Sequence, residues 1–250
     1  MSWANRFSIS GKTALVTGAS SGIGAEITRV FTEAGAKVIA SGQSQKRLAT
    51  LAAESGCEII AADIATPRGC RDLVAGALAV SPRIDILVNS AGVALVGPVL
   101  DFTVENWDRT MAINLRAPFL LARGLAPQMI EARAGKIINI SSQTGVIALR
   151  DHAAYASSKG GLNALTKSLM VELAPHSIQV NAICPTVVMT EMGREIWSPP
   201  EKSGPMIAAT PLGRFGEPVE IADMALFLAS PASDLVNGAL MMIEGGYSSV

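Results

Sequence analysis

A tyrosine and a lysine stand four residues apart, at Tyr155 and Lys159, in a stretch otherwise rich in small residues. Positions i and i+4 of a helix share one face, so the phenol and the ammonium should point the same way. A free phenol titrates at about 10, and a nearby cation stabilises phenolate and lowers that pKa. The pair therefore predicts a general acid–base group for a carbonyl or alcohol oxygen. A core tyrosine beside a surface lysine is the alternative, and it is the better interpretation of an isolated pair.

Three glycines in the stretch "TGASSGIG" lie between a predicted strand and a predicted helix. Glycine lets the backbone turn tightly and approach a pyrophosphate, and the helix N-terminus offers free N–H groups to that anion. The alternative is a tight turn without a ligand, but its place at the start of an alternating array of strands and helices favours dinucleotide binding. The residues assigned to this turn are Gly18, Ser20, Ser21, Gly22, Ile23 and Gly24.

Two other strand ends are candidates for the same cofactor site. The Asp63 carboxylate could accept a hydrogen bond from an adenine amino group, or it could stabilise the N-terminus of the next helix. The side chains of the turn "NSAG" are small, so a cofactor ribose could lie on its backbone. The alternative interpretation is a turn that binds no ligand. The cofactor-binding residues predicted here are Asp63, Ile64, Asn89, Ala91 and Gly92.

The residues that end the second strand bear on the choice of dinucleotide. An acidic residue at that place binds the adenosine ribose of NAD, and here the place falls at Gly42, with no acid nearby. Gln43 and Ser44 could donate to a 2′-phosphate, and Lys46 and Arg47 could supply charge, although a solvated helix face is the better interpretation of either basic residue taken singly. The segment favours NADP(H), with NAD(H) as the alternative.

Seven short apolar runs alternate with helical patterns along the chain. Continuous apolar strands separated by helices predict a parallel sheet with helices on both faces, so the fold class is α/β, doubly wound and of the Rossmann type. We expect one domain over residues 1–250, with a substrate-loop insertion at about 186–216 that is rich in proline and glycine. The expected strands are 12–17, 36–41, 57–62, 84–89, 135–140, 178–183 and 239–244.

Composition limits the other classes of function. The formal net charge is −1 and only 4% of residues are aromatic, which argues against nucleic-acid binding. The three cysteines are scattered and odd in number, so they predict neither a disulfide framework nor a metal site. The N-terminal stretch has no signal-like apolar core and no apolar run is long enough to span a membrane, which predicts a cytoplasmic protein with no membrane partner.

These motifs resemble the short-chain dehydrogenase/reductase family over essentially the whole chain, from "TGASSGIG" through "NSAG" and "YASSK" to the terminal "EGGY". The resemblance implies that Tyr155 is the acid–base residue and that Lys159 lowers its pKa and holds the nicotinamide ribose. It also implies that Ser142 binds the substrate oxygen and that Asn114 holds a water of a proton relay. Ser141 is the rival for the serine role, and the spacing back from the tyrosine favours Ser142.

The chain departs from the family pattern after the sixth strand. The family usually has Pro-Gly there, whereas this chain has Pro185 followed by Thr186, which could narrow the space beside the nicotinamide. By the same resemblance, Val188 and Thr190 are placed to bind the carboxamide of the cofactor.

Parts of the chain are similar to the L-xylulose reductases of the family, also known as dicarbonyl reductases. Three residues, Gln143, His152 and Trp197, match pocket positions of that group and imply binding of sugar hydroxyls under a lid. Their alternatives are a turn-capping glutamine, a surface histidine and a tryptophan that anchors the long loop.

The sequence thus predicts an enzyme, an NAD(P)(H)-dependent oxidoreductase that interconverts a carbonyl and a secondary alcohol on small ketoses, polyols or α-dicarbonyls. The alternatives are an NAD-dependent sugar or polyol dehydrogenase, a 3-oxoacyl-thioester reductase and, from another class, a non-catalytic dinucleotide sensor. The resemblance further implies a homotetramer, because the helices that carry Asn114 and Tyr155 pack subunits together in relatives.

Overall fold

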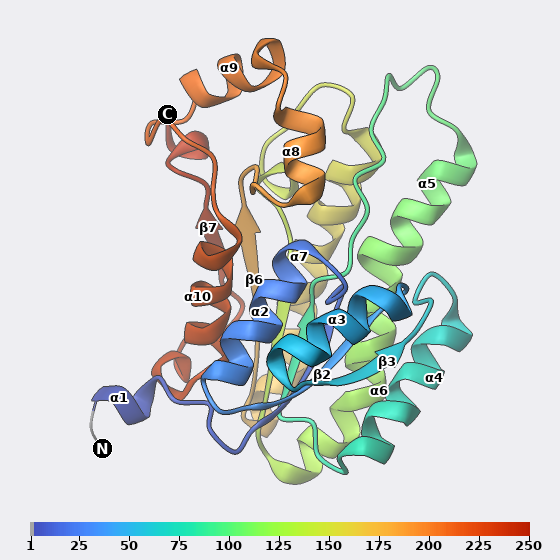
Figure 1. The fold of residues 1–250 in the computed structure, drawn as a ribbon, viewed down its shortest axis with the longest axis vertical. Helices are drawn as coiled ribbons and strands as arrows, with labels where there is room; N and C mark the ends of the chain where they lie inside the picture. Colours follow the sequence, from blue (N-terminus) through green and yellow to red (C-terminus); the bar gives the residue numbers. More distant parts are fainter. Residues whose placement is uncertain (1–2) are drawn as a thin grey trace.

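Seven parallel strands form one sheet at the centre of the molecule, and their order is β3-β2-β1-β4-β5-β6-β7 (Figure 1). The computed structural model describes residues 3–250. This arrangement confirms the predicted doubly wound α/β fold. The strands are β1 Thr13–Thr17, β2 Lys37–Gly42, β3 Glu58–Ala61, β4 Ile86–Asn89, β5 Gly135–Ile140, β6 Ile178–Pro185 and β7 Leu240–Ile243.

The central strands are buried on both faces, as their continuous apolar runs predict. Every residue of β1 and of β4 is buried. The expectation was wrong for β3 and β7, whose residues are half-buried or exposed. These two strands lie at the edges of the sheet, where each has a neighbour on one side only. An apolar run alone does not show whether a strand is central or at an edge.

Helices cover both faces of the sheet and define two apolar cores. On one face Phe31 and Leu48 pack with Ile221 against Val16 and Val38. On the other face Leu73 and Leu121 pack against Leu15 and Leu87. The first layer consists of α2 Gly22–Glu33, α3 Gln45–Ser55 and α10 Pro218–Ala229. The second consists of α4 Pro67–Val80, α6 Ala117–Ala132 and α7 Ala153–Leu173.

Two further α-helices lie outside the substrate-loop segment in the described part of the chain, which also has short 3-10 helices at Gln143–Gly145, Ala174–His176, Pro231–Ser233 and Tyr247–Ser249. The two α-helices are α1 Trp3–Arg6 and α5 Val104–Met111, and a π-helical turn at Ala112–Arg116 joins α5 to α6. No helix within residues 3–250 combines the length and the apolar character that crossing a bilayer requires.

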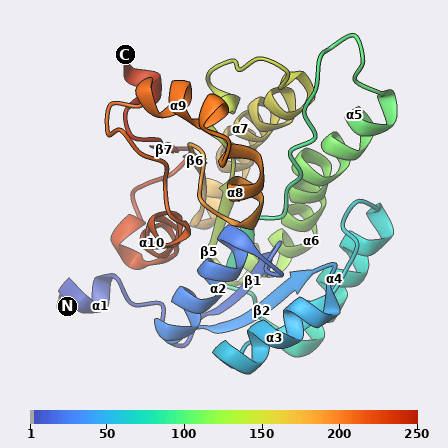
Figure 2. The ribbon, with the colours of Figure 1, turned by 45° about the horizontal axis from the view of Figure 1, so that its top comes forward.

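The segment 186–216 is more regular than its proline and glycine content predicts. It contains α8 Glu191–Trp197 and α9 Pro200–Ala208. The Thr190 hydroxyl caps α8 by accepting a hydrogen bond from the Gly193 amide at 3.0 Å, and Pro200 begins α9. A proline in the first turn is compatible with a helix because its missing N–H would have no partner there. Figures 1 and 2 show α8 and α9 on the side of the molecule toward which β6 points.

The strand order fixes where a ligand can bind. The chain proceeds outward from β1 to β3 on one side and from β4 to β7 on the other, so the order reverses between β1 and β4. Ligands of open α/β sheets bind beyond the carboxyl ends of the strands at such a switch point. The glycine turn after β1, the end of β4 and the segment after β6 all meet there.

Candidate active site

A cavity of about 640 Å³ lies at the switch point, beyond the carboxyl ends of the strands. It brings together residues from most of the sequence motifs that were assigned to cofactor or substrate. The predicted residues that line it are Gly18, Ser20, Ser21, Gly22, Ile23, Gly24, Gly42, Gln43, Ile64, Ala91, Gly92, Ser142, Gln143, His152, Tyr155, Lys159, Pro185, Thr186, Val188, Thr190 and Trp197. Four predicted residues lie outside its lining: Ser44, Asp63, Asn89 and Asn114.

The turn after β1 forms one wall, and its glycines are required by close packing. A β-carbon at Gly18 would lie 2.6 Å from the Ala91 Cα, and one at Gly24 would lie 2.5 Å from the Gly18 oxygen. Gly18 also has a φ of +69°, which favours glycine. The turn therefore has no room for a side chain at these two positions.

The N-terminus of α2 faces this cavity without a side-chain cap. Ser21 is the N-cap residue and its hydroxyl makes no capping hydrogen bond, whereas Ser44 caps α3 and Thr66 caps α4. The first N–H groups of a helix have no partner inside the helix, so α2 presents free donors and a positive dipole end to the cavity. This geometry fits a pyrophosphate.

Of the residues expected to bind adenosine near the end of β2, some line the cavity and some do not. Gly42 and Gln43 line the cavity, and no carboxylate ends the strand. Ser44 and Asp63 do not line it, and each has a local partner. The Ser44 hydroxyl accepts from the Arg47 amide at 3.3 Å, and the Asp63 carboxylate accepts from Gln43 Nε2 at 2.8 Å.

The opposite end of the cavity is formed by the segment after β6. Pro185, Thr186, Val188 and Thr190 line it, and the buried Thr186 hydroxyl has no hydrogen-bond partner within residues 3–250. A buried polar group normally has a partner, so this hydroxyl fits the polar carboxamide of a nicotinamide. The uncapped helix, the glycine turn and the unpaired hydroxyl together fit a dinucleotide that extends across the carboxyl ends of the strands.

Tyr155 and Lys159 lie on one face of α7, as their spacing predicts. The Lys159 Nζ stands 5.7 Å from the centre of the Tyr155 ring and donates a hydrogen bond to the Ile140 carbonyl at 2.8 Å. Gly92 lies against this ammonium, since a β-carbon there would be 3.6 Å from Nζ. The side chains that the sequence assigns to proton transfer therefore line one cavity.

The electrostatics of this pair differ from the expectation. Burial raises the pKa of Tyr155, and a hydrogen bond with Ser142 opposes that rise. Burial also lowers the pKa of Lys159 to about 8. The predicted lowering of the Tyr155 pKa by Lys159 is therefore wrong for the protein without cofactor, where desolvation is the largest effect on both groups.

The hydrogen bonds around the two candidate serines favour Ser142 for the substrate oxygen. The Ser142 Oγ accepts from the Thr144 hydroxyl at 3.0 Å and from the Thr144 amide at 3.2 Å. With both lone pairs engaged, its own proton is free to donate toward Tyr155 or a bound oxygen. The Ser141 hydroxyl also belongs to the cavity lining, but its proton is engaged in a hydrogen bond to the main-chain oxygen of Lys159 at 3.3 Å.

Asn114 is buried beneath the cavity and lies in the π-helical turn, a feature that is frequent at functional sites. Its Oδ1 accepts from the Val93 amide at 2.9 Å, and its Nδ2 donates to the Val93 carbonyl and to Ser158 Oγ at 2.9 and 3.0 Å. The side chain thus joins the segment after β4 to α7. Its role in holding a water stays a prediction.

Asn89 is also buried outside the cavity. Its Nδ2 donates to Asn139 Oδ1 at 2.8 Å, and the Asn139 Nδ2 donates to the Thr166 hydroxyl at 2.9 Å. This chain of side chains connects β4, β5 and α7 behind the cavity. In this structure Asn89 positions the strand end rather than lining the space for a cofactor.

The three residues predicted to bind substrate come together in the cavity. Gln143 is 2% exposed, and its side chain makes no hydrogen bond with the part of the protein that the structure describes. The His152 Nδ1 donates to the Arg150 carbonyl at 2.5 Å, since a carbonyl can only accept, and its ring meets the Tyr155 ring edge-on. Trp197 combines both of its predicted roles: it lines the cavity and also packs on Phe215 with ring centres 5.9 Å apart.

Several residues of the cavity were not predicted from the sequence. Thr144 orients Ser142, and its position two residues later in "SSQT" was an available signal. Arg109 lies near the end of α5, and no motif marks it. Glu191 lies at the start of α8 and bonds Arg47, a contact that spans 144 residues. Within residues 3–250 no three acidic, histidine or cysteine side chains are grouped to hold a metal ion.

Comparisons with known proteins agree with this geometry. Residues 18–248 match a family model described as enoyl-(acyl carrier protein) reductase. The chain is 42% identical over 244 residues to the NAD-dependent glycerol dehydrogenase of Listeria innocua, with 97% of this chain and 96% of that protein covered. It is 41% identical over 241 residues to the L-xylulose reductase of Bos taurus, with 96% and 97% covered.

A solved structure shows the same fold with a cofactor bound. The gluconate 5-dehydrogenase from Burkholderia cenocepacia, in complex with NADP and tartrate, superposes with a TM-score of 0.93 at 35% identity and with 99% of both chains covered. The similarity to L-xylulose reductases that the sequence motifs predicted is confirmed. The chain belongs to the short-chain dehydrogenase/reductase family and is an NAD(P)-dependent oxidoreductase that acts on CH–OH groups.

Proposed function

We propose that the protein is a reversible, NADP(H)-linked reductase of small ketoses and dehydrogenase of the matching polyols. The observation that carries this proposal is the buried Oε1 of the Gln143 amide, which has no hydrogen-bond partner within the described residues and belongs to a side chain of the cavity lining beside Ser142. A buried amide without a partner indicates a polar ligand, because leaving such a group unpaired costs about 1 to 3 kcal/mol.

The catalytic residues supply the proton chemistry. A bound nicotinamide supplies hydride to the carbonyl carbon, or takes it up in the reverse direction. Ser142 donates a hydrogen bond to the substrate oxygen, and the Tyr155 hydroxyl donates its proton to the same oxygen in reduction and takes it back in oxidation. Lys159 holds the cofactor ribose and replaces the proton that Tyr155 gives, and Asn114 holds the water through which the proton reaches solvent.

The polar groups of the substrate region favour hydroxylated substrates over simple diketones. In a neutral His152 ring whose Nδ1 donates to the Arg150 carbonyl, Nε2 is an acceptor and needs a donor from the ligand. A hydroxyl group both donates and accepts, so a polyol or ketose can satisfy His152 and Gln143 together. Diacetyl has carbonyl oxygens only and can donate to neither side chain. L-xylulose reductases and glycerol dehydrogenases among the relatives act on hydroxylated compounds, which supports the same choice.

Initial rates with NADPH and NADH, measured side by side on L-xylulose, erythrulose and diacetyl, test this proposal. We expect a higher kcat/KM for the ketoses, and we expect Gln143→Leu to lower that value about tenfold while changing diacetyl reduction less than threefold. Gln179→Leu, at a β6 glutamine that does not line the cavity, is the matched control. Equal losses on ketose and diacetyl would contradict the role of Gln143, and no turnover on any carbonyl or polyol would point to a dinucleotide sensor.

The choice of NADP(H) follows from the end of β2. No carboxylate stands there to bind a ribose diol or to repel a 2′-phosphate, and Arg47 lines the cavity near Gln43. The solved gluconate 5-dehydrogenase contains NADP, whereas the glycerol dehydrogenase is named as NAD-dependent. NAD(H) is therefore the alternative that the same rate measurements decide.

The remaining proposals concern the working unit. We propose one catalytic domain over residues 1–250, in which segment 186–216 is the substrate lid, and a cytoplasmic location in which the three free, buried cysteines stay reduced.

A homotetramer is proposed as well, because exposed apolar side chains lie on three helices of one region: Trp107 on α5, Phe119 on α6 and Val171 on α7. Light scattering should give a mass about four times the 25.9 kDa of the chain. The mass of a single chain would contradict this assembly.

A further inference from the structure

An ion pair crosses the cofactor cavity between two distant parts of the chain. The Arg47 Nη1 donates to the Glu191 Oε2 at 2.7 Å, and the Arg47 Nη2 donates to the Glu191 Oε1 at 3.1 Å. Arg47 belongs to the first turn of α3, and Glu191 is the first residue of α8 in the proposed lid. Both residues line the cavity. The pair therefore ties the lid to the adenosine-binding end of the site.

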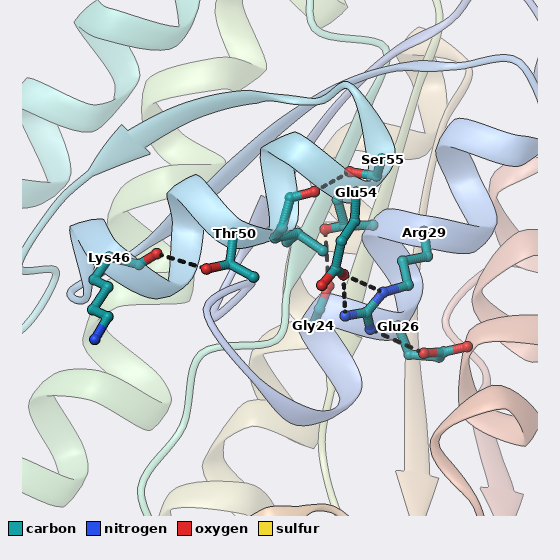
Figure 3. Close-up of polar contacts among 9 residues, drawn as sticks. Gly24, Glu26, Arg29, Lys46, Thr50, Glu54 and Ser55 are labelled. Carbon is teal, nitrogen blue, oxygen red and sulfur yellow. Dashed lines mark hydrogen bonds and ion pairs between the residues drawn. The ribbon is translucent and has the colours of Figure 1, made fainter.

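Arg47 is also the basic group best placed at this end of the cavity. The Gln43 amide donates to Asp63, and the Ser44 oxygen is engaged as the cap of α3. Lys46 does not line the cavity, and Figure 3 shows its side chain extending away from α2. Among the described lining residues at the end of β2, Arg47 alone carries a positive charge. A planar guanidinium can donate two parallel hydrogen bonds to a carboxylate or to a phosphate.

We propose that Arg47 is the residue that recognises the 2′-phosphate of NADP(H), and that Glu191 on the lid competes with this phosphate for the Arg47 guanidinium. This inference rests on the proposed dinucleotide site. A 2′-phosphate carries more negative charge than a carboxylate, so Arg47 leaves Glu191 when the phosphate binds. NAD(H) has no such group, so the ion pair persists with NAD(H) and α8 stays tied to α3.

Two consequences follow from the competition. Glu191 weakens NADP(H) binding, because the phosphate must displace it and then lies near its charge. The identity of the cofactor also affects the lid: with NADP(H) the N-terminus of α8 loses its contact with α3, whereas with NAD(H) it retains it. Cofactor preference is thereby decided in part by Glu191, which lies 144 positions along the chain from Arg47.

Calorimetric titration of NADP⁺ and NAD⁺ into the full chain and three variants tests the proposal. We expect Arg47→Gln to raise the Kd for NADP⁺ at least tenfold and that for NAD⁺ less than twofold. Glu191→Gln should lower the Kd for NADP⁺ about three- to tenfold and leave NAD⁺ within twofold. The double variant should show no gain from Glu191→Gln, since the gain depends on Arg47.

A second readout follows the lid itself. Hydrogen exchange of the α8 amides should be faster in wild-type protein saturated with NADP⁺ than with NAD⁺, and Arg47→Gln should abolish that difference. The matched control is the pair of Arg29 on α2 and Glu54 on α3, which is also exposed and bonded at 2.9 Å but lies outside the cavity (Figure 3). Arg29→Gln should change neither Kd nor the exchange of α8.

The outcomes separate this inference from the proposed function. Binding of both dinucleotides with an unchanged NADP⁺ to NAD⁺ ratio in Arg47→Gln would overturn the role of Arg47 and leave the oxidoreductase proposal intact. A gain from Glu191→Gln that persists without Arg47 would overturn the competition, since it would show simple charge repulsion. Failure of wild-type protein to bind either dinucleotide would overturn the cofactor site itself.

Discussion

Replacement of Tyr155 by phenylalanine is expected to lower kcat by about 10²- to 10⁴-fold, the range that a positioned general acid–base contributes. In the proposed mechanism the phenol exchanges a proton with the substrate oxygen, whereas Ser142, whose oxygen accepts two hydrogen bonds from Thr144, only donates a hydrogen bond to it. Phenylalanine keeps the ring that packs on His152, so the fold and the binding of cofactor should change little. Stopped-flow measurement of a single turnover with NADPH and L-xylulose separates the chemical step from binding.

Tyr247 supplies the control for this variant. It is the only other tyrosine of the chain, it lies in a short helix near the C-terminus, and it does not line the cavity. Tyr247→Phe should retain wild-type turnover. A Tyr155→Phe protein with more than about a tenth of wild-type kcat would show that another group transfers the proton.

Replacement of Lys159 by methionine should abolish catalysis and at the same time stabilise the protein without cofactor. Burial lowers the pKa of Lys159 from 10.5 to about 8, so at pH 7 the folded protein holds an ammonium that is only 4% exposed. Each unit of such a shift corresponds to about 1.4 kcal/mol. The variant also loses the hydrogen bond from Lys159 to the Ile140 carbonyl, which reduces the gain in stability by about 1 kcal/mol. We expect a net gain of about 1 to 3 kcal/mol in the free energy of unfolding at pH 7.

The sign of this effect gives it a distinctive dependence on pH. Because the folded pKa lies below the unfolded one, the unfolded chain binds more protons between pH 8 and 10.5, and the wild-type protein gains stability as the pH rises through that window. The advantage of Lys159→Met should therefore be full below pH 8 and disappear by about pH 10.5. Urea titrations across this range measure it, with Lys167→Met, at an exposed site of the same helix, as the control. If the difference in unfolding free energy between Lys159→Met and the wild-type protein were the same at every pH, burial would not destabilise the charged form of Lys159.

Much of the fold and the centre of the site could be predicted from local sequence. The continuous apolar runs indicated all seven strands, because a strand covered on both faces must be apolar on both. The glycine turn could also be predicted locally, because a tight turn without room for side chains needs glycines at nearby positions. The shared helix face of Tyr155 and Lys159 could be predicted from their spacing of four residues. The position of Gly18 against Ala91 and the common cavity of Tyr155 and Lys159 agree with those predictions.

Other features depended on contacts between distant residues, and the sequence by itself could not determine them. Ser44 was predicted to reach the cofactor, but it caps α3, and Asp63 is held by Gln43. The pKa of Tyr155 rises because burial outweighs the opposing hydrogen bond with Ser142, and burial is a property of the whole fold.

By itself, then, the sequence determined the strands, the tight glycine turn and the shared helix face of Tyr155 and Lys159, because each is set by residues a few positions apart. Only the tertiary structure decided which strands lie at the edges, which polar groups remain unpaired in the cavity and that Glu191 meets Arg47. The physical reason is that desolvation and ion pairing depend on which surfaces the folded chain brings together. The distance between two residues in the sequence does not show whether they meet in the fold.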